Sequence, residues 1–574
     1  MYYLAWSIYK MSVLPEEYQE ALGVFDSLIE RSNQLLTEEG RRSDFEPDAI
    51  RYIAHSFADI SDITGDSPVA VAERFFSTRN PKGYESKAFA VLAEVLELYG
   101  RYEDAIEVYV RLQQDPWQFS PENPGYQVRI VQLHVSGDTP DPDAAAAARM
   151  AITERFNERS SWWYANRNQP QALQEARKYI EGSLSSVAVE YHGIAAASAD
   201  RRDYLAAAEQ FASYLDAFPL SDDYYGHEWL FAANLFGANE FERANTVAQS
   251  LSRTSRVHGY GDSALFLRLL ISEKRMLSEY GPAEASPSVW GGRVQENRTM
   301  PNGTTVVVYE ISDVHQEYMN VRDIVADHEV KSVEAEWAYD AEKLRSTFDK
   351  NRAAYLYNVA QVLMEHRHFD DARARYMEVI DQYPDRNEAA YSATAIIDSF
   401  NFEGDLANTR KYAKIYSRMQ LGDTEDKSMA FANIEQAAAF KQAAGLAKAG
   451  DREAAALAYE EFYAEYPDSD IAPDAMFNAA LNHEKSGSVG RSNQILEQFV
   501  NTYPNHERSK NLLFRIASNY ESTFELSQAI RYYTDLVARF PESQNAVSAY
   551  YNAAFLKTGV GDFFGAAQDF EMFA

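Results

Sequence analysis

The chain has 574 residues and a formal net charge of −33; 46% of its residues are hydrophobic, 13% are aromatic and none is cysteine. This length exceeds that of a single-core domain, so it predicts several domains or a repeat array, and the apolar content excludes a disordered chain. The acidic balance disfavours nucleic acid and favours basic partners, whereas the lack of cysteine excludes disulfides, thiolate zinc sites and cysteine nucleophiles.

The N-terminal segment MYYLAWSIYKMSVLPEEYQEALGVF predicts a helical hairpin. It lacks the basic start and the cleavage site of a signal peptide, and no stretch of the chain reaches the ~20 apolar residues of a membrane span. Helix pairs are expected over 1–112, with a small residue one turn before a ring at Ala21 and Phe25 and at Ala105 and Tyr109. The sequence also ends inside a helical pattern, so we expect it to be part of a longer protein; whether a signal peptide or lipid anchor precedes Met1 stays open.

A loop-rich stretch is expected after residue 112, and whether 113–182 and 255–345 are degenerate repeats or something else stays open. The segments DPWQFSPENPGY and SGDTPDPD contain several prolines that mark turns, and helix is expected to resume at about 143. Two further helix pairs are expected over about 183–253, where DYLAAAEQFASYLDAFP repeats the spacing of small and aromatic residues and ends in proline.

The stretch around residues 281–310 interrupts the helical pattern. Pro301, Asn302 and Gly303 lie between two alternating runs, 293–300 and 304–309, and the second run is rich in β-branched residues. This pattern predicts a β-hairpin or an extended linker. We therefore expect an N-terminal helical array over 1–280, the insertion over 281–310, and a regular C-terminal array over 311–574.

The C-terminal array repeats itself with a period of 37 residues, as the prolines at 467, 504 and 541 show. Small residues lie twelve positions before each proline, large ones eight and five before, and an aromatic residue directly before. These positions are Ala455, Ser492 and Ala529; Tyr459, Leu496 and Tyr533; Phe462, Phe499 and Leu536; and Tyr466, Tyr503 and Phe540. The offsets place them on one helical face, and the proline ends the helix.

The first helix of the next unit is expected after each proline, with a ring ten residues on and an alanine thirteen residues on. These residues are Phe477, Phe514 and Tyr551, and Ala480, Ala517 and Ala554. Each unit is therefore predicted to be two antiparallel helices that approach closely at the small residues. One unit cannot bury its apolar face alone, so units must stack.

These units resemble tetratricopeptide repeats, in which a small residue precedes an aromatic one by a turn and a proline closes the second helix. The resemblance is strong over about 350–574, partial over 84–112 and 183–252, and poor elsewhere; the tryptophan of that family near the repeat start is absent from most units. The Tyr-Pro closure, the 37-residue spacing and the large residue at 462, 499 and 536 resemble the bacterial envelope subgroup of the Tol–Pal system and of outer-membrane protein assembly. The resemblance implies an all-α, right-handed superhelical solenoid of stacked antiparallel helix pairs.

No catalytic or cofactor motif occurs in the sequence: GxGxxG, GxxxxGK[ST], HExxH and GxSxG are all absent. His366 and His368 are two residues apart, so they fall on different faces of a helix and are expected to cap a turn and not to bind a metal. The acidic segment DTPDPD lacks the glycine and the closing glutamate of a calcium loop. The sequence therefore predicts no enzyme, no cofactor and no metal.

Four polar residues occupy one phase of the repeat, two residues before its alanine: Asn358, Asn478, Arg515 and Asn552. The family resemblance implies that this position faces a concave groove, where Asn can pair with a peptide backbone and Arg with a carboxylate. The alternative is that these side chains solvate the helix surface or bridge neighbouring helices.

The expected function is a non-enzymatic scaffold that binds other proteins or peptide segments, located in a bacterial periplasm or cell envelope. It rests on fold resemblance and not on a site. Two alternatives stay open: a cytoplasmic co-chaperone or regulatory array that binds extended peptides, and the repeat region of a larger enzyme. The sequence does not indicate an oligomeric state.

Overall fold

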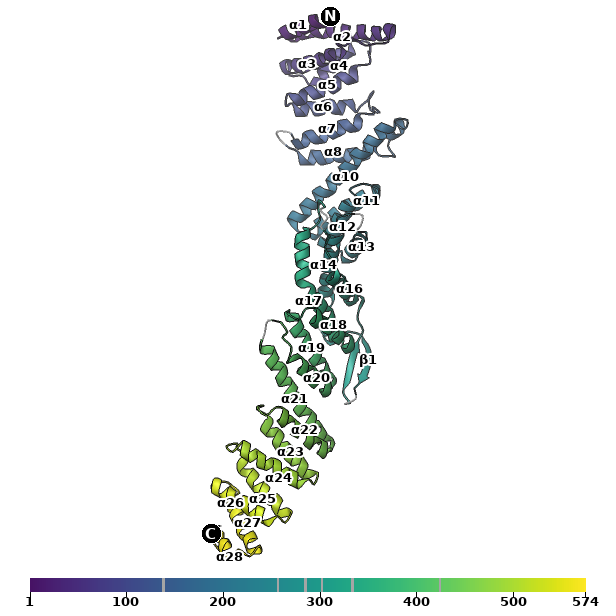
Figure 1. Cartoon of the computed structure of the whole chain (residues 1–574). Helices are drawn as coiled ribbons and strands as arrows, with labels where there is room; N and C mark the ends of the chain where they lie inside the picture. Colours follow the sequence, from purple (N-terminus) through teal and green to yellow (C-terminus); the bar gives the residue numbers. More distant parts are fainter. Residues whose placement is uncertain are drawn as a thin grey trace. The chain divides into compact units, whose positions relative to one another are not determined.

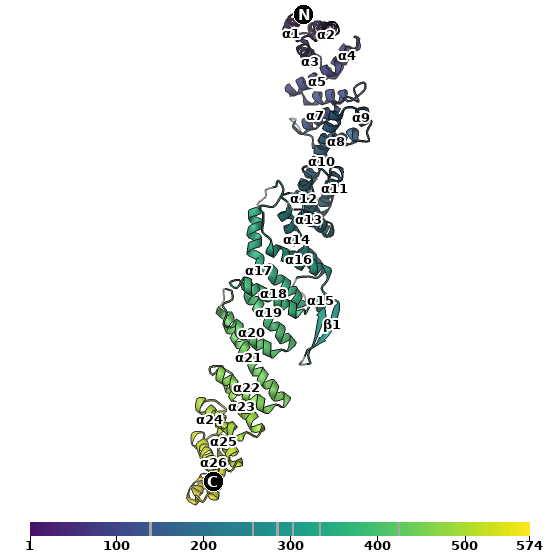
Figure 2. The ribbon, with the colours of Figure 1, turned by 45° about the vertical axis from the view of Figure 1, so that its right-hand side comes forward.

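The computed structural model describes residues 1–136, 140–254, 258–282, 286–300, 303–331, 335–422 and 425–573, with no side-chain detail at 425–427. This part of the chain contains 28 helices and one two-stranded antiparallel sheet. Figures 1 and 2 show successive helices of each region packed in antiparallel pairs. The expected all-α stack of helix pairs with one short β insertion is thus confirmed.

The chain divides into two compact units. Unit 1 comprises Met1–Ile271 and Ser332–Ala341, and unit 2 comprises Ser272–Lys331 and Glu342–Ala574. The division at Ile271 falls inside helix α14 (Gly261–Glu279), and the β insertion belongs to unit 2.

Unit 1 consists of helices joined by short loops. They are α1 (Tyr2–Met11), α2 (Pro15–Glu39), α3 (Glu46–Thr64), α4 (Pro68–Ser77), α5 (Glu85–Leu98), α6 (Tyr102–Leu112), α7 (Asn123–Ser136), α8 (Pro142–Phe156), α9 (Ser161–Ala165), α10 (Pro170–Ser198), α11 (Arg201–Ala217), α12 (Tyr224–Gly237), α13 (Phe241–Arg253) and the first part of α14. Four of them begin at a proline, whose fixed φ suits the first helical position. Gly40 and Gly65 end α2 and α3 in the left-handed region, which only glycine adopts without strain.

Helix α7 lies where the sequence predicts a loop-rich stretch. Pro124 marks a turn in the sequence, but in the structure it is the second residue of α7, where its missing N–H costs no helical hydrogen bond. The loop expectation is therefore wrong over Asn123–Ser136 and holds over 113–122, whereas residues 137–139 of the second proposed turn lie outside the described residues.

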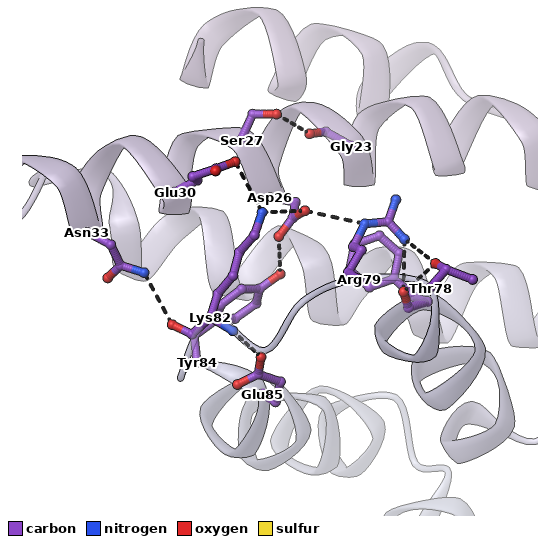
Figure 3. Close-up of polar contacts among 11 residues, drawn as sticks. Gly23, Asp26, Ser27, Glu30, Asn33, Thr78, Arg79, Lys82, Tyr84 and Glu85 are labelled. Carbon is purple, nitrogen blue, oxygen red and sulfur yellow. Dashed lines mark hydrogen bonds and ion pairs between the residues drawn. The ribbon is translucent and has the colours of Figure 1, made fainter.

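A buried carboxylate fixes the turn between α4 and α5 of unit 1 (Figure 3). Asp26 on α2 accepts from Tyr84 Oη at 2.8 Å and from Lys82 Nζ at 2.9 Å, and Arg79 Nε lies 3.3 Å from it. Burial raises the pKa of Tyr84, so its hydroxyl stays protonated and donates. The buried carboxylate is paired with two cations and accepts from a hydroxyl, so this cluster holds the loop against α2. Both oxygens of Asp26 already have partners within the protein.

The segment 335–341 returns to unit 1 and packs on α12. Trp229 Nε1 donates to the carbonyl of Trp337 at 2.7 Å, and Ser263 Oγ accepts from the N–H of Tyr339 at 2.8 Å. Gly226 makes the close approach possible, since a Cβ there would lie 2.8 Å from the ring of Trp337.

Unit 2 contains the β insertion and the regular array. Its elements are the second part of α14, α15 (Pro287–Trp290), β1 (Val294–Thr299), β2 (Thr305–Tyr309), α16 (Asp313–Asp327), α17 (Ala341–Glu365), α18 (Phe369–Gln382), α19 (Asn387–Glu403), α20 (Leu406–Tyr416), α21 (Glu425–Ala449), α22 (Arg452–Glu465), α23 (Ala472–Lys485), α24 (Val489–Thr502), α25 (Ser509–Ser522), α26 (Leu526–Arg539), α27 (Ala546–Gly559) and α28 (Phe563–Phe573).

The predicted core positions of the array are buried. At the small position these are Ala455, Ser492 and Ala529, and at the large positions Tyr459, Leu496, Tyr533, Phe462, Phe499 and Leu536. The residue before each proline leaves the helical region: Tyr466, Tyr503 and Phe540 have ψ near +60° and cap α22, α24 and α26. The 37-residue period thus encodes both the packed face and the end of each second helix.

The β-hairpin is confirmed, with β1 and β2 paired antiparallel from Val294↔Tyr309 to Thr299↔Thr305. Residues 301 and 302 of its predicted turn lie outside the described residues. Val306 and Val308 of β2 are buried against Phe369 at the start of α18, whereas every residue of β1 is exposed. The apolar contacts of the hairpin with the array therefore come from β2, and Arg298 of β1 adds an ion pair with Asp370 at 4.0 Å.

His366 and His368 lie at the turn between α17 and α18, as expected. The N–H of Tyr309 donates to the carbonyl of His366 at 3.0 Å, and His368 Nε2 lies 2.9 Å from the carbonyl of Tyr309. The two histidines thus hold the end of β2. None of the described helices combines the length and apolarity that crossing a membrane requires.

Candidate protein-binding surface

The four candidate groove residues lie on first helices of the pairs in unit 2. Asn358 is on α17, Asn478 on α23, Arg515 on α25 and Asn552 on α27, and each side chain is partly exposed. The alanine two residues later is buried in every case. The residues therefore border the packed face of their helices, and their contact with a ligand stays a prediction.

Arg515 already has a partner inside the protein. Its Nε and Nη2 donate to the two carboxylate oxygens of Glu484 on α23, at 2.8 and 2.7 Å. Asn519 Nδ2 also approaches Glu484, at 3.4 Å, and donates to Asn493 Oδ1 at 2.9 Å. The guanidinium fork is thus occupied, so an incoming carboxylate would have to compete with Glu484 for it.

A hollow of about 480 Å³ lies between α23 and α25 and includes Arg515. The rings of Phe477 and Phe514 and the polar side chains of Arg508, Asn511 and Ser518 also line it. Arg508 pairs with Asp474, and its guanidinium lies 4.8 Å from the ring centroid of Phe477. The surface offers apolar rings framed by cations that are held in place by carboxylates.

Asn478 and Asn552 are not among the residues that line this hollow. The carbonyl of Asn478 accepts from Asn482 Nδ2 at 2.8 Å, and the side chain of Asn552 lies near the hydroxyl of Tyr533, whose pKa it lowers. The structure therefore brings Arg515 to the hollow and places the two asparagines beside it, along neighbouring helices.

Sequence reasoning missed Glu484, although the signal was available. Glu484 and Glu521 are 37 residues apart, so they occupy the same position at the end of successive first helices. Glu521 accepts from Tyr533 at 2.9 Å, twelve residues later. Twelve residues after Glu484 is Leu496, which cannot donate, and Glu484 pairs with Arg515.

One contact in unit 1 has the geometry of a catalytic dyad. Ser185 Oγ lies 2.8 Å from His227 Nε2, and His227 Nδ1 lies 2.9 Å from the carbonyl of Asp223. His227 is fully buried, however, and stacks on Tyr214 with ring centroids 3.8 Å apart. No substrate can reach the imidazole, so the contact joins α10 to α12. Among the described residues, no group of three or more His, Asp or Glu could hold a metal ion.

Four segments match the family model of the tetratricopeptide repeat: residues 354–386, 437–469, 474–506 and 512–543. They coincide with α17/α18, α21/α22, α23/α24 and α25/α26. The chain contains tetratricopeptide repeats. The match covers the part of the array that holds Asn358, Asn478 and Arg515.

No curated protein matches the chain. Among solved structures, BtubC from P. vanneervenii is 13% identical, with 37% of this chain and 89% of that chain covered and a TM-score of 0.22. The type IV pilus biogenesis factor PilW is 10% identical (38% and 90% covered, TM-score 0.20), and Naa15/Naa10 bound to HypK-THB is 12% identical (95% and 67% covered, TM-score 0.25). At such identities and TM-scores these proteins say nothing about what this chain binds.

Proposed function

We propose that the chain is a non-enzymatic scaffold for protein–protein interaction. The observation that carries the proposal is the array of tetratricopeptide repeats with a hollow on its first helices, lined by rings and by arginines. A stack of helix pairs offers a long binding surface and supplies no reactive group of its own. The dyad-like contact of Ser185 with His227 is closed to substrate, because His227 is fully buried.

The binding surface of this proposal comprises Asn358, Asn478, Arg515 and Asn552. A partner segment would lie along the first helices, with side chains against Phe477 and Phe514. Arg515 would either exchange Glu484 for a carboxylate of the partner, or stay paired with Glu484 and form part of the wall of the hollow that the partner contacts. The net charge of −33 favours a partner whose overall charge is positive.

A bacterial periplasm or cell envelope is the proposed location. The support is the repeat pattern itself: the Tyr-Pro closure, the 37-residue period and the large residue at 462, 499 and 536 resemble the envelope subgroup of these repeats. A cytoplasmic regulatory array and the repeat region of a larger enzyme remain the alternatives. A partner that binds only through a free C-terminal carboxylate would favour the cytoplasmic array.

The test is photo-crosslinking followed by titration. A photoreactive residue at Ser518, which lines the hollow, captures the partner, and a peptide from the crosslinked region is then titrated against the full chain. Replacing Asn478, Arg515 and Asn552 together by alanine should weaken binding by about 1–3 kcal/mol for each charge-assisted bond lost, with the helical spectrum unchanged. Arg531→Ala, an exposed change on α26, is the matched control. Equal affinity of the triple variant and the parent would contradict the proposed surface.

A further inference from the structure

A second and larger hollow, of about 690 Å³, lies in unit 1, apart from the repeats discussed above. Its apolar walls are Trp163 on α9, Ile180 on α10, and the segment Phe218, Pro219 and Leu220 that follows α11. Figure 1 shows α10 and α11 as consecutive helices of this region. The hollow lies where α10, the α8–α9 loop and the end of α11 meet.

The walls of this hollow are held in place by hydrogen bonds. Tyr214 Oη lies 2.8 Å from Ser221 Oγ and donates to Glu181 Oε1 at 3.1 Å, so it ties the segment after α11 to α10. Burial raises the pKa of Tyr214 to about 12, which keeps this donor protonated. Phe218 packs against the cluster of Phe156, Trp162 and Ile180. The hollow is thus preformed, which reduces the entropy cost of binding.

Leu220 is the feature that sets this hollow apart. In the four regular Tyr-Pro or Phe-Pro closures of unit 2, the residue after proline is polar: Asp385, Asp468, Asn505 and Glu542. In unit 1 the same position holds Leu220, whose side chain is 96% exposed at the mouth of the hollow. An exposed leucine by itself is ordinary, but here it extends an apolar wall formed by Trp163 and Phe218.

The charges around the hollow select the chemistry of its occupant. Arg177 Nη2 pairs with Glu158 at 2.6 Å, and the Arg177 guanidinium lies 5.4 Å from the ring centroid of Trp163, so both charges are compensated. Glu181 also lines the hollow, where it is partly buried and accepts the hydroxyl of Tyr214. Arg159 lines the hollow as well but is exposed, and among the described residues no ion pair joins it to a carboxylate. In a protein with 87 acidic and 54 basic residues, an uncompensated arginine beside an apolar wall favours an acidic group in the occupant.

We propose that this hollow is a docking site for a partner peptide segment in which a bulky apolar side chain adjoins a carboxylate. The apolar side chain fills the space between Trp163, Phe218 and Leu220. The carboxylate pairs with Arg159 at the mouth. This site is separate from the groove of the regular array, so the chain can hold two segments at once.

Selection from a library of random peptides on the immobilised full chain tests the proposal. Peptides kept by the parent and not by Leu220→Ser should carry an aromatic or branched aliphatic residue next to Asp or Glu. Because Leu220 is exposed, this change leaves the fold intact, and it should weaken binding of a selected peptide about tenfold or more. Arg159→Glu should change the selected neighbour from Asp or Glu to Lys or Arg.

Two controls separate this site from the groove. Leu457→Ser removes an exposed leucine on α22 and should leave the selected peptides bound. The triple alanine variant at 478, 515 and 552 should also bind them as the parent does, even if it has lost the partner of the groove. The proposal is overturned if no peptide distinguishes the parent from Leu220→Ser, if the distinguishing peptides lack the apolar–acidic pair, or if Arg159→Glu selects the same peptides.

Discussion

The helix pair α5/α6 in unit 1 and the pair α25/α26 in unit 2 share one contact that the pair α23/α24 lacks. Tyr109 donates to Glu97 at 2.7 Å and Tyr533 donates to Glu521 at 2.9 Å, in both cases across twelve residues. The carboxylate lies at the end of a first helix and the tyrosine in the middle of the second. The same tyrosine–glutamate hydrogen bond therefore occurs in a region where the resemblance to the repeat family is only partial.

Two of the three glutamates at this position also contact the next first helix. Glu97 pairs with Arg129 on α7, and Glu484, in the pair that lacks the tyrosine, pairs with Arg515 on α25. The separations are 32 and 31 residues. The glutamate at the end of a first helix therefore joins one pair to the following one, and Arg515 has a counterpart in a unit where no groove was predicted. This comparison teaches that the candidate site residue has a structural task as well.

The largest effect is expected from overpacking both pairs. Ala105→Leu in α6 and Ala529→Leu in α26 each add three carbons at a fully buried helix crossing. Each should lower the free energy of unfolding by about 1–3 kcal/mol, because close-packed helices must move apart. Thermal denaturation of the full chain measures this.

If α5/α6 packs as α25/α26 does, both variants should lose similar amounts of stability. A loss for Ala529→Leu with an unchanged curve for Ala105→Leu would show that α5/α6 only imitates the regular pairs. The exposed change Leu457→Ala on α22 serves as the control.

The next effect concerns acid and comes from two neighbouring histidines of unit 2. His315 on α16 and His366 are both buried, with ring centroids 4.7 Å apart, and Tyr280 and Trp290 pack on His315. Burial, with the neighbouring His366, lowers the pKa of His315 to about 4, and burial also lowers the pKa of His366. His366 Nε2 is buried without a hydrogen-bond partner among the described residues.

Because the folded-state pKa of His315 is depressed, its neutral form stabilises the fold above the unfolded value of about 6.5, and this contribution falls as pH drops toward 4. The loss should be up to about 1.4 kcal/mol per pH unit. The amide of Tyr309, which donates to the carbonyl of His366, reports on this loss. At pH 5 its hydrogen exchange should be faster than the pH dependence of the intrinsic, base-catalysed rate predicts. In His315→Phe the extra acceleration should be smaller, because only His366 still titrates; an unchanged acceleration would show that His315 is not its source.

Removing the shared hydroxyls should have a moderate effect. Tyr109→Phe and Tyr533→Phe leave the rings in place and take a donor from Glu97 and Glu521, at a cost of about 0.5–1.5 kcal/mol each. Tyr551→Phe on an exposed ring of α27 should cost nothing measurable. Urea titration at neutral pH gives the values.

Alkaline pH tests the contribution of the Tyr533 hydroxyl in a second way. Burial raises the pKa of Tyr533 to about 12, so the protonated hydroxyl contributes fully below the unfolded value of about 10 and its contribution is lost as pH rises toward 12. The parent should lose stability over this range faster than Tyr533→Phe. Parallel decline of the two would mean that Tyr533 titrates as an exposed phenol.

The periodic features were predictable from the sequence and the irregular ones were not. The small and large positions around Ala529, the proline that ends each second helix and the hairpin at 294–309 all follow from local spacing, because one face of a helix must be buried and β-branched runs favour strands. Helix α7 was missed because proline at a helix start and proline in a turn look alike.

Contacts between separate pairs were also beyond the sequence. The hollow at Leu220 combines segments about sixty residues apart in irregular helices. The Asp26 cluster likewise joins α2 to a loop more than fifty residues later. No local pattern encodes such meetings, since they depend on how the helices stack.

The smallest stability effect, and the sharpest functional one, is expected from the two bridging arginines. Arg129→Ala and Arg515→Ala each break a partly exposed ion pair, so each should lower the free energy of unfolding by no more than about 1 kcal/mol. If Arg515 only joined one helix pair to the next, the two variants would behave alike in every assay. The proposed groove requires instead that Arg515→Ala weakens binding of the captured partner about tenfold while Arg129→Ala does not, since a lost charge-assisted bond costs more than a solvated pair.

Arg515→Lys separates the roles further, because a lysine keeps the charge beside Glu484 but cannot form the two-pronged contact. Titration of the crosslinked partner segment against the four proteins decides between stacking and recognition: equal affinities would assign Arg515 to the stack, and a loss confined to changes at 515 would assign it to the groove.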